Sequence, residues 1–295
     1  MVNGRVKMAN DQIEIVPTGA ALGAEIRGID LSKPIRDDTF DAIEQAFDTH
    51  SVTYFRGQQL DEGQFQDFVC RFGEMQVNFL KRYTIKGRPL ILQVSNIKEN
   101  GEDIGHADAG RVWHSDMSYE WNPPRMSVLY AREVPVSKDG EIKGDTLFAS
   151  AVQAYDSLSG EMKERCTGLK VVHDVAGRRR NTGTGTQDNA QREAMEKVVH
   201  PVIRTHPYTG RKAIYVNMGE CVSIQGMKDE EALDLINELA ATVIRPEFQY
   251  RHKWQVGDVL IWDNCALQHL AAHDFGLPLR RMMWRISGCP TEVYE

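Results

Sequence analysis

The stretch GDVLIWDNCALQH, residues 257–269, joins an apolar, strand-like run to a polar turn and ends on a histidine. Its strand part, Asp258 to Trp262, is short, rich in β-forming residues and bounded by turn residues. Segments of the same kind recur along the chain: Pro89 to Val94, Met126 to Glu133, Val199 to Arg204, Lys212 to Val216, Phe248 to Trp254 and Arg281 to Ser287. Many short strands with long connections are typical of a β-sandwich or jelly roll. No GxGxxG motif follows a strand, so a Rossmann fold is not expected.

Helical periodicity predicts helices that flank these strands. Apolar residues recur at helical spacing over Asp37 to His50, where Asp37 or Asp38 is available as the N-cap. The other expected helices are one that contains Phe65, Phe68, Val69 and Phe72, one around Ala151 to Cys166 and one around Asp229 to Thr242. Without internal repeats or a long linker, we expect a flexible N-terminal extension at 1–10 and a single domain over 11–295.

Composition limits the classes of function. The chain has 295 residues, of which 41% are hydrophobic and 26% charged, as in ordinary globular proteins. Its net charge of −7 argues against a nucleic-acid binder, and no apolar run is long enough to span a membrane. Its five cysteines form no CxxC pair, which favours a reducing, cytoplasmic location over a disulfide or thiolate-zinc framework.

Residues 177–192 lack apolar periodicity and are rich in Gly, Thr and Arg. The short basic cluster Arg178-Arg179-Arg180 within them is explained by an ordinary solvated loop and does not indicate nucleic-acid binding. A segment of this length without periodicity is either disordered or functional, and we regard it as a candidate active-site lid.

The sequence Trp113-His114-Ser115-Asp116 contains an HxD pattern. In an extended segment, residues i and i+2 point to one face, so His114 and Asp116 can present an imidazole and a carboxylate to one point. With a remote histidine they would form the facial triad of non-haem iron(II) oxygenases, which leaves three metal positions open. HxD alone is not specific. His269 after the WDN turn is the favoured third ligand and His273 the alternative. His106 is close enough to the HxD segment to line the pocket, but nothing marks it as a ligand. Structural explanations suffice for His50, His173, His200, His206 and His252.

Several motifs together resemble the TauD/TfdA family of dioxygenases. They are VTYFRGQ (Val52 to Gln58), RFGE (Arg71 to Glu74), WHSD (Trp113 to Asp116), GDTLF (Gly144 to Phe148), RTHPYTGRKAIYVN (Arg204 to Asn217), GDVLIWDN (Gly257 to Asn264) and RRMMWR (Arg280 to Arg285). The likeness runs over nearly the whole chain, and the order and spacing of HxD, GDT, WDNxxxxH and RRxxxR are specific in combination.

The resemblance implies a double-stranded β-helix, a distorted jelly roll, with flanking helices. It implies that His114, Asp116 and His269 bind Fe(II), and that Thr146 and Arg281 bind the distal carboxylate of 2-oxoglutarate. Family members use O2, release succinate and CO2, and hydroxylate a C–H bond. Related halogenating enzymes lack the carboxylate ligand, so Asp116 favours hydroxylation. Many members are dimers or tetramers, so a homo-oligomer is expected.

The substrate is the least determined part. The arginine matching Arg285 meets the substrate anion in the family, and an even separation from Arg281 places both side chains on one strand face. Asn78, Lys81 and Gly110 replace the other taurine-binding residues, while Lys81 resembles a lysine of the phenoxyacetate enzyme. We therefore expect a small carboxylate with an aromatic or apolar tail, with sulfonates or sulfate esters as the alternative.

Other activities are compatible with part of the pattern. Desaturation or ring formation would use the same triad, and a non-catalytic metal- or ligand-binding jelly roll would not need Thr146 and Arg281. A zinc hydrolase would need neither Arg281 nor oxygen.

Overall fold

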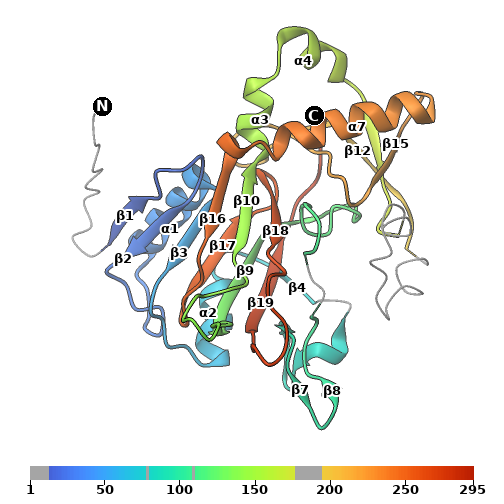
Figure 1. The fold of residues 1–295 in the computed structure, drawn as a ribbon. Helices are drawn as coiled ribbons and strands as arrows, with labels where there is room; N and C mark the ends of the chain where they lie inside the picture. The colour runs from blue at the N-terminus through green and yellow to red at the C-terminus, as the bar shows by residue number, and fades with distance from the viewer. Residues whose placement is uncertain (1–12, 78–79, 108–109, 177–194) are drawn as a thin grey trace.

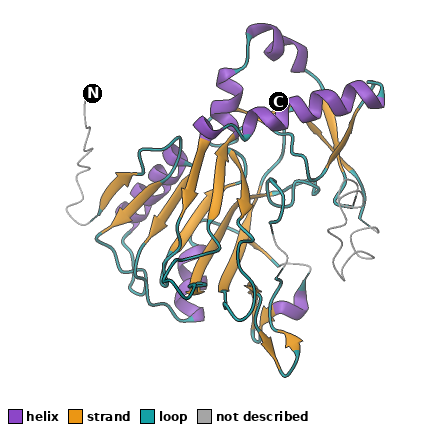
Figure 2. Cartoon of the chain, in the orientation of Figure 1, coloured by secondary structure: helices purple, strands orange, loops and turns teal. Residues whose placement is uncertain are grey.

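The computed structural model describes residues 13–77, 80–107, 110–176 and 195–295. The expected N-terminal extension at 1–10, the candidate lid at 177–192 with its arginine cluster, and Asn78 lie outside these residues. The described chain is mainly β, with helices on the outside of the sheets (Figure 2). This agrees with the expectation of a mainly β chain with flanking helices.

The largest sheet has nine strands in the order β1-β2-β3-β17-β9-β19-β6-β5, and β4 pairs with β19. Neighbouring strands are antiparallel except β2 and β3, which are parallel. The strands are β1 (Glu14–Pro17), β2 (Ala24–Arg27), β3 (Val52–Phe55), β4 (Met75–Gln76), β5 (Thr84–Ile85), β6 (Arg88–Ser95), β9 (Pro124–Glu133), β17 (Val259–Asp263) and β19 (Met282–Pro290).

A second sheet, of three strands, lies against one face of the large sheet (Figure 1). Its order is β16-β10-β18, with β10 (Thr146–Ser150) between β16 (Gln249–His252) and β18 (Leu267–Ala271). Buried side chains from both sheets, among them Leu129, Phe148 and Trp262, form one apolar cluster. The space between the two sheets is therefore the core layer into which inward-facing strand residues project.

Helices α1 (Asp37–His50) and α2 (Glu62–Cys70) cover the opposite face of the large sheet (Figure 1). Phe40, Phe47, Phe65 and Phe68 are buried there against β-strand side chains. The bounds of α1 match the prediction, but the expected N-cap is wrong. Arg36 is the N-cap residue, and both aspartates lie in the first turn, where negative charge stabilises the helix dipole.

The remaining elements are α3 (Ala151–Ser157), α4 (Gly160–Cys166), α7 (Asp229–Val243), β7 (Lys98–Glu99), β8 (Glu102–Asp103), β11 (Lys170–His173), β12 (Val198–Pro201), β13 (Ile203–Thr205), β14 (Lys212–Ile214), β15 (Cys221–Ile224), and the 3-10 helices η1 (Lys81–Tyr83) and η2 (Pro246–Phe248). Among them, α3, α4, α7, β12 and β15 lie at the upper end of Figure 1, and β7 and β8 form an antiparallel hairpin at the lower end.

Two of the predicted elements are divided. The helix expected over Ala151 to Cys166 is α3 and α4, because the Ser159 hydroxyl accepts a hydrogen bond from the backbone N–H of Met162 and starts a new helix. The strand expected over Val199 to Arg204 is β12 and β13, which pair in different sheets.

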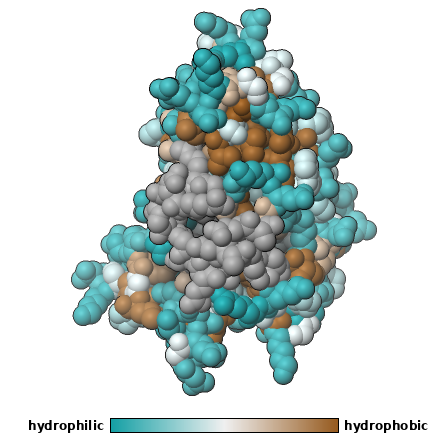
Figure 3. All heavy atoms as spheres, turned by 90° about the vertical axis from the view of Figure 1, so that its right-hand side faces the viewer, coloured by the Kyte–Doolittle hydropathy of each residue, from teal (hydrophilic) through white to brown (hydrophobic). Residues whose placement is uncertain are grey.

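Of the described residues seen in Figure 3, those around the rim are largely hydrophilic, and apolar residues form a band in the upper half. Among the described residues, no helix is long and apolar enough to cross a membrane. All five cysteines are free thiols.

Candidate active site

His114 and His269 face each other across a single antiparallel β-bridge. The backbone N–H of each residue donates to the carbonyl of the other, at 3.1 and 2.8 Å. His269 lies in β18, whereas the HxD segment is not a strand: it has this one bridge and then turns. Asp116 is held at the start of the turn because its N–H donates to the Asn264 side chain, and Met117 follows with φ of 51°.

The side chains of His114, Asp116 and His269 converge, with their ligand atoms within 4.8 Å of one another. Asp116 Oδ1 lies 3.5 Å from Nε2 of His114 and 3.7 Å from Nε2 of His269. All three residues are buried. Two imidazole nitrogens and one carboxylate oxygen are the donor set of the iron facial triad, and His273 is not part of it.

The two imidazoles are oriented differently. Nδ1 of His114 donates to the Val112 carbonyl at 2.8 Å, so its Nε2 carries the free lone pair. The His269 ring packs against the rings of Trp262 and Phe148. Burial and the nearby His114 lower the pKa of His269 to about 3, which keeps it neutral and able to bind a metal.

Asp116 is ionised. Burial alone would raise the pKa of Asp116, but Arg285, His269 and His114 outweigh that effect and hold the pKa well below its ordinary value. The Arg285 guanidinium lies 2.8 Å from Oδ2. The carboxylate is thus a permanent anion with one oxygen toward the imidazoles and the other toward Arg285.

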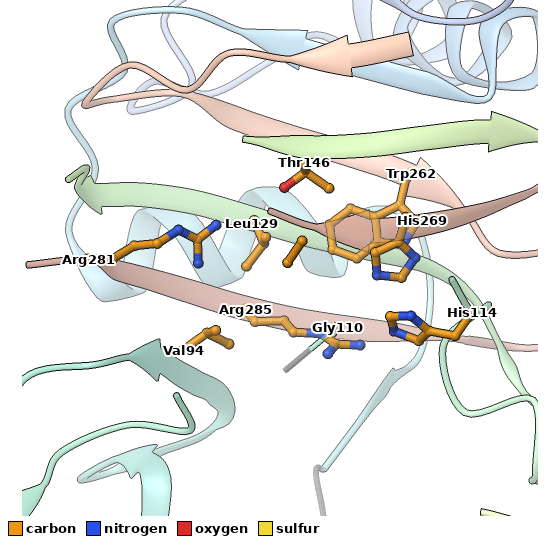
Figure 4. A pocket seen from close by; sticks show the side chains of 10 residues that line it. Val94, Gly110, His114, Leu129, Thr146, Trp262, His269, Arg281 and Arg285 are labelled. Atoms are coloured by element: carbon orange, nitrogen blue, oxygen red, sulfur yellow. The ribbon is translucent and has the colours of Figure 1, made fainter. Parts of the chain in front are cut away.

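These side chains border a cavity between the two sheets (Figure 4). The Arg281 guanidinium lies at one end of it and the two imidazoles at the other, with Thr146 and Leu129 between them. Residues from both sheets line it: Val94, Gly110, His114, Leu129, Thr146, Trp262, His269, Ala271, Arg281 and Arg285.

Arg281 is a buried cation that lines the cavity. No carboxylate among the described residues forms a salt bridge with it, and its Nε has no hydrogen-bond partner there. Burial lowers the pKa of Arg281 to about 10, which still leaves it charged at neutral pH. Because a buried unpaired charge is costly, this arrangement indicates a site for an anion.

Thr146 is prepared to donate a hydrogen bond into the same cavity. Its hydroxyl oxygen accepts from the Trp254 indole N–H at 3.0 Å, so its own proton is available to a ligand oxygen. Gly144, two residues before Thr146, has φ of +76°, and a Cβ there would lie 2.9 Å from the Phe275 ring and 3.3 Å from Cδ of Arg281. Glycine therefore permits the close packing that brings the GDT segment beside Arg281.

Arg285 and Lys81, both expected to meet the substrate, lie in different settings. Arg285 lines the cavity, as its even separation from Arg281 suggested. Lys81 is exposed in η1 and does not line the cavity, so its role stays a prediction. Gly110 lines the cavity beside His114, whereas Asn78 lies outside the described residues.

A second buried group, His206, Asp263 and Cys265, also has its ligand atoms within 4.8 Å. Nδ1 of His206 accepts from two backbone N–H groups, so Nε2 carries the proton and donates to Asp263 at 2.8 Å. Burial raises the pKa of the Cys265 thiol to about 12. With neither a free imidazole lone pair nor a thiolate, this group is a structural network.

Known proteins match the chain over most of its length. A sequence model of the family described as "Taurine catabolism dioxygenase TauD, TfdA family" matches residues 14–287. The chain belongs to this family.

Relatives that are named for different substrates have about the same sequence identity to this chain. The chain is 32% identical over 267 residues to the alpha-ketoglutarate-dependent 2,4-dichlorophenoxyacetate dioxygenase of Cupriavidus pinatubonensis, covering 86% of this chain and 90% of the relative. It is 31% identical over 279 residues to an alpha-ketoglutarate-dependent sulfate ester dioxygenase of Pseudomonas putida, covering 90% and 86%. The crystal structure of AAD-2 in complex with Mn(II) and N-oxalylglycine matches with a TM-score of 0.79 at 27% identity, covering 95% of this chain and 98% of that one.

This TauD/TfdA family member is an oxidoreductase, a dioxygenase that depends on 2-oxoglutarate, Fe(II) and O2. Sequence reasoning missed four residues that hydrogen-bond to the side chains of the site. The Val112 carbonyl accepts from His114, Ser127 donates to Asp116, and Trp254 donates to Thr146. Ser287 in turn forms a hydrogen bond with Ser127. No local motif marks them, because each acts through a partner distant in sequence or through its backbone.

Proposed function

We propose that the protein hydroxylates a small organic anion, a carboxylate with an aromatic or apolar tail, in a cavity between two sheets of a double-stranded β-helix. His114, Asp116 and His269 would hold Fe(II), and Thr146 and Arg281 would bind 2-oxoglutarate. The observation that carries this proposal is the buried guanidinium of Arg281, which has no carboxylate partner among the described residues and shares a cavity with the imidazole–carboxylate–imidazole group.

Arg281 and Thr146 would fix the far end of 2-oxoglutarate. A guanidinium pairs with a carboxylate through two parallel hydrogen bonds, and the Thr146 hydroxyl adds a third donor. A carboxylate held at that end of the cavity directs the other end of the same molecule toward the imidazoles (Figure 4). Bound iron and 2-oxoglutarate supply oxygen activation, by which one oxygen atom enters the substrate and the other enters succinate as CO2 leaves.

Arg285 would receive the anionic group of the substrate. Its Nε and Nη2 donate to protein groups, whereas no described residue accepts from Nη1. Val94, Leu129 and Trp262 give the same cavity apolar walls, which favour an apolar or aromatic tail beside the anion. A relative that acts on 2,4-dichlorophenoxyacetate supports this substrate class, and the sulfate ester dioxygenase supports the alternative of sulfonates or sulfate esters.

A substrate screen tests the proposal. The Fe(II)-loaded protein is incubated with 2-oxoglutarate, O2 and matched carboxylates, sulfonates and sulfate esters that carry the same phenoxyalkyl tails, and succinate is measured. We expect substrate-dependent succinate with carboxylates above the other two series, and a product that gains one oxygen. A product that loses two hydrogens would indicate desaturation or ring formation. No succinate with any compound would favour a non-catalytic binding protein, and turnover without O2 would favour a zinc hydrolase.

The proposal has two further parts, a homo-oligomer and a cytoplasmic location. The first is supported by the resemblance to a family in which oligomers are common, and the second by the five free cysteines. Light scattering on the purified full chain tests the first of these: a monomer at micromolar concentration would contradict it.

A further inference from the structure

The carboxylate oxygen of Asp116 that faces away from the imidazoles is bound by a set of polar side chains. Ser127 donates to Oδ2 at 2.7 Å, and Arg285 lies 2.8 Å from the same oxygen. Ser127 and Ser287 are in turn 2.7 Å apart, hydroxyl to hydroxyl. All of these groups except Arg285 are buried, so water does not compete for their hydrogen bonds.

The strand register explains why the two serines meet. Ser127 in β9 and Ser287 in β19 are direct cross-strand partners. Directly opposite side chains on one sheet face have Cβ atoms about 4.5–5.5 Å apart, which is within hydroxyl hydrogen-bond reach. The pair is thus built into the sheet, and it does not depend on a loop.

The charges at the two ends fix the direction of the hydrogen bonds. An ionised carboxylate can only accept, so the Ser127 proton points at Asp116 and Ser127 accepts from Ser287. The Ser287 oxygen accepts from Nε of Arg285 at 3.2 Å. The result is a one-way chain from the Arg285 guanidinium through Ser287 and Ser127 to Asp116, in which each bond strengthens the next.

We infer that Ser127 and Ser287 are positioning residues that hold Oδ2 of Asp116 so that Oδ1 alone faces the metal. One-oxygen ligation keeps three metal positions open, whereas a carboxylate free to rotate would take a second position. Ser127 and Arg285 both contact Oδ2 of Asp116. When Arg285 turns to bind a substrate anion, the Ser127 hydrogen bond still holds Asp116 in place. This inference rests on the proposed metal site.

Metal affinity is the readout that distinguishes positioning from general packing. Mn(II) binding to the full-length protein is titrated calorimetrically for wild type, Ser127→Ala, Ser287→Ala and the double variant. Loss of a group that orients a metal ligand typically weakens binding 10- to 100-fold, so Ser127→Ala should raise the Kd for Mn(II) by at least about tenfold. Ser287→Ala should raise the Kd by less than Ser127→Ala does, but by more than about threefold, because one hydrogen bond of the chain is lost. Because the two act in series, the double variant should bind no more weakly than Ser127→Ala alone.

Ser95→Ala is the matched control. Ser95 is also a buried strand serine, and its hydroxyl donates to the Arg281 carbonyl at 2.8 Å, so the variant loses a comparable hydrogen bond without touching Asp116. Its Mn(II) affinity should equal that of wild type, and thermal unfolding compares the folded states of all variants. If Ser127→Ala does not fold, Ser287→Ala carries the test.

The possible outcomes distinguish failure of the positioning role from failure of the metal site. If wild type binds Mn(II) one to one and the serine variants bind it within threefold of wild type, or if Ser95→Ala loses as much affinity, the positioning role is wrong while the metal site stands. If wild type does not bind Mn(II), the proposed metal site fails and this inference fails with it.

Discussion

Replacing Arg281 by methionine should make the ligand-free protein more stable and its 2-oxoglutarate binding much weaker. The side chain is buried and has no carboxylate partner among the described residues. Burial lowers the pKa of Arg281 from 12.5 to about 10, which corresponds to roughly 3 kcal/mol of cost for the charged form. Methionine fills similar space without that cost, so we expect the free energy of unfolding to rise by about 1–3 kcal/mol.

If Arg281 binds 2-oxoglutarate as proposed, the same substitution removes two charge-assisted hydrogen bonds to its carboxylate. Each contributes about 1.5–3 kcal/mol, so the affinity should fall by at least about 100-fold. Calorimetric titration of 2-oxoglutarate into the Mn(II)-loaded protein measures this, and thermal unfolding of the metal-free protein measures stability.

Arg280→Met is the matched control, since Arg280 is exposed and pairs with Glu133 at 2.9 and 3.0 Å. It should leave 2-oxoglutarate binding unchanged. An Arg281→Met protein that binds 2-oxoglutarate within threefold of wild type would refute the assigned role. An Arg281→Met protein that is less stable than wild type would refute the claim that the buried charge of Arg281 destabilises the ligand-free protein.

Three further substitutions test individual parts of the site and its support. Thr146→Val should weaken 2-oxoglutarate binding by about tenfold in the same titration, because it removes one donor to a charged group; unchanged affinity would contradict this. Gly144→Ala should lower the free energy of unfolding by about 1–2 kcal/mol in urea, since φ is +76° and the new Cβ meets Phe275; an unchanged midpoint would contradict it. Burial lowers the pKa of His200 to about 4. As the pH drops, His200 is therefore protonated in the unfolded chain before it is protonated in the folded chain, and the free energy of unfolding falls between pH 6.5 and about 4. Between pH 7.5 and 5.5 this effect lowers the free energy of unfolding by about 1.4 kcal/mol, and His200→Phe should abolish that part of the decrease. An unchanged pH dependence of the free energy of unfolding would contradict it.

Local patterns predicted those features that depend on nearby residues. The stripe Phe40, Ile43 and Phe47 gave the bounds of α1 because one helix face packs on the sheet. The i, i+4 separation of Arg281 and Arg285 placed both at the cavity, because an extended strand repeats every two residues.

Features set by partners distant in sequence were not predictable in this way. The HxD segment was expected to be extended, yet only His114 is bridged, because Asn264 holds Asp116 where the chain turns. The serines behind Asp116 are 160 residues apart and meet only through the β9–β19 register. Lys81 was chosen by resemblance, and the structure places it exposed in η1 and outside the cavity lining.

The central claim is that His114, Asp116 and His269 hold Fe(II) beside a 2-oxoglutarate anchored by Arg281. Its most direct test is the visible absorption band that appears when 2-oxoglutarate is added anaerobically to the Fe(II)-loaded protein. We predict one iron per chain and a band in wild type, no band in Asp116→Ala or His269→Ala, and a band in His273→Ala. A band of wild-type intensity in either ligand variant, or its loss in His273→Ala alone, would contradict the account.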